Sequence, residues 1–298
     1  MVDLRRPKRD RRYWLRLLLF FLLVIVALPL LLVFIIANNE ALSYVSPAPS
    51  HVTRPANLPS NAQDVSFQGG DNLTLRGWYM PSRNGSVIIL LHGYFADRTQ
   101  MLFQAFHLIE QGYGTLLYDE RGAGQSDGSQ RSFGWRDVAD VGGALTFLKD
   151  KATSVGILGC SIGGQIALRA TAQYPQIRAV LADGPAMVSA EDSPQAENAI
   201  GALKLRYDWL VDRLVEFHVG MSAPPSVMAT IGQIAPRPIM LFAGALGNEK
   251  SHIRLYQQAA GSNAQLWEIP GATHCDGPAT APEEYARRMI EFFNSAQS

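Results

Sequence analysis

One serine of this sequence stands between glycines at a spacing that suits a catalytic nucleophile. Ser161 has Gly159 two residues before it and Gly163 two residues after it. A serine in a sharp turn from a strand into a helix adopts strained backbone angles, and glycines at these positions remove the Cβ atoms that would clash there. The turn also places the following N–H groups at a helix N-terminus, where they favour an anion. The pattern predicts that Ser161 is a nucleophile.

A serine hydroxyl becomes a good nucleophile only when a base takes its proton, and His274 is the predicted base. It falls in a loop between a strand predicted at 265–269 and a helix predicted at 282–294. The other histidines lie in a proline-rich stretch, in helical patterns or directly before a glycine: His51, His107, His218, His252 and His92.

The imidazole of such a base needs a carboxylate to fix its tautomer and to stabilise its charged form. In the chain order serine, acid, histidine, this carboxylate should follow the strand predicted at 238–243. The loop there contains Glu249 as its only carboxylate, and we predict that Glu249 is the acid. Asp183, at the end of the preceding strand, remains the alternative, whereas Asp276 is too close in sequence to His274 to orient it easily.

Strand-like apolar runs alternate with helical patterns at short spacing, which is typical of a doubly wound, mostly parallel sheet. The predicted strands are 64–67, 73–80, 86–91, 114–118, 154–158, 177–182, 238–243 and 265–269, the first two as a hairpin. The predicted helices are 97–111, 135–149, 162–173, 250–260 and 282–294. The alternation pauses at about 185–236, where a helical pattern over 196–219 predicts a small helical cap.

These motifs together resemble the α/β-hydrolase fold superfamily over residues 62–296. Beyond the serine turn, Leu91-His92-Gly93-Tyr94 matches the family's H-G-x oxyanion loop, and residues 118–128 resemble its D-x-R-G-x-G-x-S-x-G loop. The chain departs from the family pattern at the acid, where many relatives carry aspartate.

The resemblance implies roles for four further residues. The backbone N–H groups of Tyr94 and Ile162 would bind the oxyanion of a tetrahedral intermediate. His92 and Arg121 would be structural and would brace the loops that shape the site. The implied activity is hydrolysis of an ester, or alternatively an amide, through an acyl-serine intermediate, with a small-molecule acyl substrate and neither a cofactor nor a metal.

Three alternatives to the esterase interpretation stay open at this point. A peptidase or an acyltransferase would use the same triad, and a fold alone does not decide among these reactions. The third alternative is a non-catalytic binding protein on a hydrolase fold, although such proteins usually lose a triad residue. The formal net charge of zero, from 26 basic and 26 acidic residues, gives no reason to expect a nucleic-acid partner.

The N-terminus has the pattern of a membrane anchor. The stretch 17–37 carries no charge, and as a helix it would span about 31 Å, close to the thickness of a hydrocarbon core. A basic cluster precedes it: Arg5, Arg6, Lys8, Arg9, Arg11, Arg12 and Arg16. Positive charge stays in the cytoplasm, so this arrangement predicts a single-pass protein with an extracytoplasmic catalytic domain.

The expected organisation is a basic tail (1–16), a transmembrane helix (17–37), an extended linker (38–61) and the hydrolase domain (62–298). A cleaved signal peptide is the main alternative for the N-terminus, although its apolar region would normally be shorter. A twin-arginine export signal is a second alternative. The two cysteines, Cys160 and Cys275, are expected to be small apolar fillers behind the site rather than a disulfide.

Overall fold

The computed structural model describes residues 11–247 and 249–296 of the chain. Most of the predicted basic tail, including Arg5, Arg6, Lys8 and Arg9, lies outside the described residues.

An eight-stranded sheet forms the centre of the domain and confirms the predicted doubly wound architecture. Only β3 runs against its neighbours; β2 pairs antiparallel with it as the predicted hairpin, and the remaining pairs are parallel. In spatial order the strands are β10 (Ala264–Ile269), β9 (Ile239–Gly244), β8 (Ile177–Asp183), β7 (Ser154–Cys160), β4 (Ser86–Leu91), β5 (Gly114–Tyr118), β3 (Thr74–Met80) and β2 (Gln63–Gln68).

Helices cover both faces of this sheet. Apolar side chains of α3 (Asp137–Leu148), α4 (Ile162–Gln173) and α7 (Glu249–Ala260) pack on one face, and those of α2 (Leu102–Glu110) and α9 (Pro282–Ser295) pack on the other. Every residue of the central strand β4 is buried, as expected for a strand with helices on both sides. Shorter elements are α6 (Val227–Thr230), α8 (Gly277–Thr280) and 3₁₀ turns at Gly70–Asn72, Arg98–Met101, Ala190–Asp192, Ile231–Ile234 and Gly261–Asn263.

The predicted cap region contains one long helix, α5 (Ala199–Val219). Asn198 caps its N-terminus by accepting a hydrogen bond from the N–H of Gly201, at 2.9 Å. The helix ends at Gly220, whose φ of +71° favours glycine.

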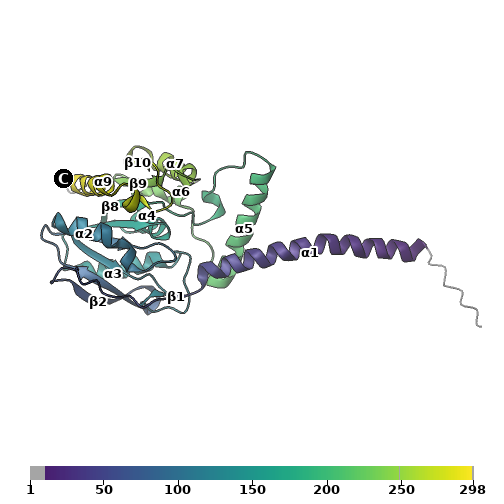
Figure 1. Cartoon of the computed structure of the whole chain (residues 1–298), viewed down its shortest axis with the longest axis horizontal. Coiled ribbons are helices and arrows are strands. Elements are labelled where there is room, and N and C mark those ends of the chain that lie inside the picture. The colour runs from purple at the N-terminus through teal and green to yellow at the C-terminus, as the bar shows by residue number, and fades with distance from the viewer. Residues whose placement is uncertain (1–10, 248, 297–298) are drawn as a thin grey trace, which may run out of the picture.

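The N-terminal helix is longer than the sequence predicted. α1 runs without a break from Arg11 to Val45 and projects from the domain (Figure 1). Its outer part is apolar and exposed, and it is long enough to span a membrane. The helix continues past Ala37 because Ala37, Ala41 and Val45, four residues apart, are buried against α5.

The expectation of an extended linker over 38–61 is therefore wrong. Its first part is helix, and the next part is held by the domain, because β1 (Ala48–Pro49) pairs with β6 (Ala123–Gly124) as a short parallel ladder. Val52 and Leu58 are buried in the same core as α2 and α9. These contacts join residues far apart in sequence, so the local composition of prolines and serines did not reveal them.

Candidate active site

Ser161 lies in the sharp turn between β7 and α4, with φ +56° and ψ −118°. A Cβ on Gly159 would lie 2.1 Å from the carbonyl oxygen of Gly163, and a Cβ on Gly163 would lie 2.6 Å from that of Leu91. No side chain fits at either position without a shift of the backbone. The two glycines that the sequence singled out are therefore what allows the chain to turn so sharply.

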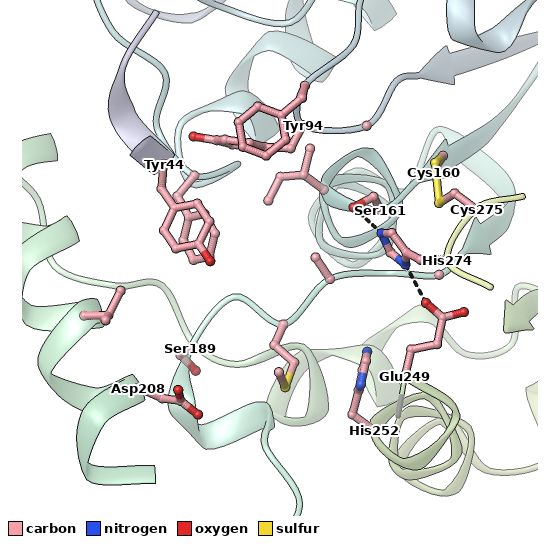
Figure 2. A pocket seen from close by; sticks show the side chains of 18 of the residues that line it. Tyr44, Tyr94, Cys160, Ser161, Ser189, Asp208, Glu249, His252, His274 and Cys275 are labelled. Atoms are coloured by element: carbon pink, nitrogen blue, oxygen red, sulfur yellow. Dashed lines mark hydrogen bonds and ion pairs between the residues drawn. A yellow bond between two sulfur atoms is a disulfide. The ribbon is translucent and has the colours of Figure 1, made fainter. Parts of the chain in front are cut away.

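Three predicted residues form one chain of hydrogen bonds (Figure 2). His274 Nε2 lies 2.8 Å from Ser161 Oγ, and His274 Nδ1 lies 2.5 Å from Glu249 Oε2. The second oxygen of Glu249 accepts the N–H of Gly244, so the carboxylate is fixed at both ends. With Nδ1–H donating to the carboxylate, Nε2 is free to accept the proton of the serine hydroxyl.

The bond to Glu249 also changes the acidity of the base. It raises the pKa of His274 above its ordinary value, although burial acts in the opposite direction. Glu249 is the first residue of α7, directly after the loop that follows β9, which is where the chain order of the predicted triad requires the acid.

Asp183, the alternative acid, lies elsewhere. Its buried carboxylate accepts the hydroxyl of Tyr285 at 2.9 Å, and its main-chain oxygen accepts the N–H of Ser161 at 2.8 Å. Burial raises the pKa of Asp183 to about 7. The main chain of Asp183 therefore holds the turn of Ser161, whereas the carboxylate hydrogen-bonded to His274 is that of Glu249.

Tyr94 and Ile162, whose N–H groups are the predicted oxyanion donors, line the same cavity as Ser161. In the described part of the chain neither N–H group donates to a protein acceptor, and Ile162 is the first residue of α4. The loop before Tyr94 is braced by His92, whose Nε2 accepts the N–H of Glu120 at 3.0 Å and whose Nδ1 is 2.7 Å from the oxygen of Gly93. This geometry agrees with the structural role that the resemblance implied for His92.

Arg121 is likewise held in a structural arrangement. Its guanidinium donates two hydrogen bonds of 2.7 Å to the buried Asp140 and one of 2.7 Å to Asp71. Asp140 also accepts the N–H of Gly70 at 2.8 Å. The arginine therefore ties the loop after β5 to α3 and to the turn between β2 and β3.

The expectation that Cys160 and Cys275 are unpaired is wrong. The two form a disulfide, with their Cα atoms 6.2 Å apart (Figure 2). Cys160 directly precedes Ser161 and Cys275 directly follows His274, so the bond joins the two loops that carry these residues. The sequence places both cysteines next to predicted site residues, and this adjacency is the signal that could have indicated the pairing.

A cavity of about 670 Å³ opens beside Ser161. Its walls include two residues of α1, Glu40 and Tyr44, which lie in the segment predicted to be a linker. Glu40 accepts hydrogen bonds from Tyr44 and, at 2.6 Å, from Tyr207 of α5. The N-terminal helix is therefore part of the pocket wall.

Tyr44 also contacts the loop that carries Tyr94. Its ring packs edge-on against that of Tyr94, with centroids 5.7 Å apart, and lies 4.6 Å from that of Phe133. Figure 2 shows the two tyrosines together on the side of the cavity facing Ser161. Within the described ranges, no group of three or more His, Cys, Asp or Glu side chains is arranged to hold a metal ion.

Comparison with known proteins identifies the class to which this fold and site belong. A family model described as serine aminopeptidase, S33, a family of hydrolases, matches residues 82–230, which is half of the chain. The chain belongs to this family of α/β hydrolases.

Several curated proteins have about a third of their aligned residues in common with this chain, over less than half of it. The chain is 32% identical over 145 residues to the polyketide transferase grgF of a Penicillium species, covering 46% of this chain and 49% of the relative. It spans about half the length, or slightly less, of this and other curated relatives that it matches.

Solved structures share the fold over most of the chain. The esterase Pf2001 of Pyrococcus furiosus has a TM-score of 0.67 at 24% identity, covering 84% of this chain and 98% of the esterase. A membrane phospholipase A described as a bacterial virulence factor has a TM-score of 0.60 at 18% identity, covering 97% of this chain and all of that one. At these identities the likeness establishes the fold alone.

Proposed function

We propose that this chain is a membrane-anchored serine hydrolase that cleaves ester bonds through an acyl-serine at Ser161. The observation that carries the proposal is the continuous hydrogen-bonded chain from Ser161 through His274 to Glu249. A serine, a correctly oriented imidazole and a carboxylate in this order are the parts that acyl transfer requires.

In the proposed reaction Ser161 Oγ attacks the carbonyl carbon of the ester while His274 Nε2 takes the hydroxyl proton. Charge develops on the carbonyl oxygen, and the N–H groups of Tyr94 and Ile162 stabilise it. The tetrahedral intermediate collapses, the alcohol leaves with the proton from His274, and the acyl group remains on Ser161. Water then attacks the acyl-serine while His274 takes its proton; Ser161 Oγ leaves with that proton, and the acid is released.

The cavity and the anchor favour an amphiphilic ester as substrate. Aromatic and aliphatic side chains line much of the pocket, among them Tyr44, Phe133 and Val211, and α1 forms part of the wall. The fold shared with a membrane phospholipase A and with an esterase agrees with this choice.

A fluorophosphonate probe tests whether the serine is reactive. The wild-type protein should become labelled and Ser161→Ala should not; absence of label on both would overturn the enzyme mechanism. A screen with p-nitrophenyl esters of graded chain length and aminoacyl-nitroanilides then tests the substrate class. Turnover of the anilides alone would make the protein a peptidase.

The membrane topology is part of the same proposal. Arg11, Arg12 and Arg16 precede the apolar stretch of α1, so the N-terminus is proposed to be cytoplasmic and the catalytic domain extracytoplasmic. A reporter enzyme that is active only outside the cytoplasm, fused after residue 298, should be active. An active reporter in the reciprocal cytoplasmic assay would reverse the orientation.

A further inference from the structure

One face of the cap helix α5 is apolar and basic but is not covered by the domain. Leu203, Arg206, Arg213 and Phe217 are exposed and, at intervals of three, four and seven residues, lie on one side of the helix. The side chains of Leu203 and Phe217 are 68% and 79% exposed. Large apolar residues interspersed with arginine are the composition of helices that lie in a membrane interface.

The opposite face of α5 fixes where these exposed side chains lie along α1. Val211, Val215 and Val219 pack against the buried alanines of α1. His218 Nε2 lies 2.9 Å from Oδ1 of Asn38, the residue directly after the end of the uncharged stretch 17–37. Phe217, the neighbour of His218 in the chain, therefore lies near the level at which α1 would leave the hydrocarbon core.

The arrangement in space agrees with this placement. Figure 1 shows α5 beside α1 at the edge of the domain from which α1 projects. Further exposed apolar side chains belong to the same helix: Ile200 and Trp209. Arg213 stacks on the ring of Trp209 at 5.7 Å and pairs with Glu216 at 2.9 Å, whereas Arg206 is exposed.

We propose that the exposed face of α5, defined by Leu203, Arg206, Arg213 and Phe217, docks on the bilayer surface beside α1. This inference rests on the proposed membrane anchorage. The apolar side chains enter the interfacial region, and the arginines meet the phosphates of lipid headgroups. The occupant is a lipid surface because α5 packs against α1, the one described helix that is long and apolar enough to cross a membrane.

Docking has a consequence for the route of the substrate. Lys204, Asp208 and Val211 of α5 and Glu40 and Tyr44 of α1 line the same cavity as Ser161. The two helices that meet the lipid therefore also form one wall of the pocket. An ester lipid from the bilayer leaflet on which α5 docks reaches Ser161 along this wall without crossing bulk water.

Labelling with an environment-sensitive fluorophore tests the docking directly. Full-length Leu203→Cys and Phe217→Cys are labelled with NBD and reconstituted in phosphatidylcholine–phosphatidylglycerol vesicles; both native cysteines are in the disulfide. Glu291→Cys, on the exposed side of α9, is the matched control. Labels at 203 and 217 should emit at shorter wavelength and be quenched by nitroxide lipids, while the label at 291 should not.

Two results of this experiment would overturn the proposal. Labels at 203 and 217 that remain as water-exposed as the label at 291 would show that α5 does not meet lipid. A blue shift that disappears when the protein-to-lipid ratio is lowered would make the occupant a second copy of the chain.

A kinetic comparison separates docking from catalysis. The double variant Leu203→Ser/Phe217→Ser should hydrolyse a long-chain ester in vesicles about tenfold more slowly. Two side chains that are each only partly buried in the interface contribute about as much as one fully buried apolar side chain. The rate of this variant on a soluble short-chain p-nitrophenyl ester should be unchanged, and an equal fall on both substrates would count against docking. If the wild type hydrolyses neither ester, the proposed function fails, and the labels alone decide whether α5 binds lipid.

Discussion

The guanidinium of Arg131 lies 3.9 Å from the ring centroid of Tyr94 and also donates a hydrogen bond to the carbonyl oxygen of that residue. The same side chain donates to the oxygen of Ser46 at 2.7 Å and to that of Ser43 at 3.3 Å, at the C-terminal end of α1. One buried arginine therefore links the N-terminal helix to the loop that carries a proposed oxyanion donor.

We predict that Arg131→Ala lowers kcat by about tenfold with little change in KM, because a loosened Tyr94 would weaken an interaction made mainly in the transition state. Steady-state kinetics on a soluble p-nitrophenyl ester measures both constants. Arg131→Lys should lose nearly as much, since an ammonium group cannot reproduce the planar set of contacts.

Arg83→Ala is the matched control for this prediction. Arg83 also donates to two backbone carbonyls, those of Ile109 and Glu110, but it lies away from the pocket. If Arg83→Ala reduced kcat as strongly as Arg131→Ala, the effect would be a general loss of stability rather than a change at Tyr94.

The triad acid can be assigned by comparing Glu249→Gln with Asp183→Asn. In Glu249→Gln the amide oxygen keeps the N–H of Gly244, so the NH₂ group faces His274 Nδ1 and forces the proton onto Nε2. That tautomer cannot take the proton of Ser161, and kcat should fall by about 10³- to 10⁴-fold.

Asp183→Asn should cost less than about tenfold, because an amide oxygen can still accept the hydroxyl of Tyr285, and the hydrogen bonds of His274 go to Glu249 and Ser161. Both variants are compared at the same pH, and their folded state is checked by circular dichroism. The assignment of Glu249 is wrong if only Asp183→Asn abolishes turnover in folded protein.

The pH dependence of the reaction should reflect the hydrogen bond between Glu249 and His274. This bond raises the pKa of His274, which means that it stabilises the protonated imidazole. Only the neutral imidazole accepts the proton of Ser161, so kcat/KM should rise with pH through a midpoint above the ordinary value of about 6.5. Glu249→Gln should move the midpoint of the residual activity to lower pH, and an unchanged midpoint would contradict this origin.

Local sequence patterns were sufficient to predict the fold and the three residues that the structure joins by hydrogen bonds. The strands stand out because a strand buried on both faces is continuously apolar, as Ser86–Leu91 is. Ser161, Glu249 and His274 each follow a strand on the same side of a parallel sheet, so chain order alone placed them near one another.

The features that the sequence did not reveal all depend on contacts between distant segments. Arg131 and Ser46 are 85 residues apart, and nothing in the composition of either segment marks the other as its partner. The extension of α1 to Val45 depends on the valines of α5, more than 150 residues later. Residues 38–61 would have the same local composition if they formed a free linker.

The disulfide between Cys160 and Cys275 should stabilise the domain and keep the site assembled. It closes a loop across 115 positions, and the chain-entropy account assigns a bond of this span about 4–5 kcal/mol of unfolding free energy. Reduction should lower the midpoint of thermal unfolding, and it should reduce activity because the bond joins the loops of Ser161 and His274. Unfolding followed by fluorescence with and without a phosphine reductant measures the change. Cys160→Ala/Cys275→Ala should start at the lower midpoint and not respond to the reductant, whereas a wild type whose midpoint and turnover resist reduction of the bond would contradict both roles.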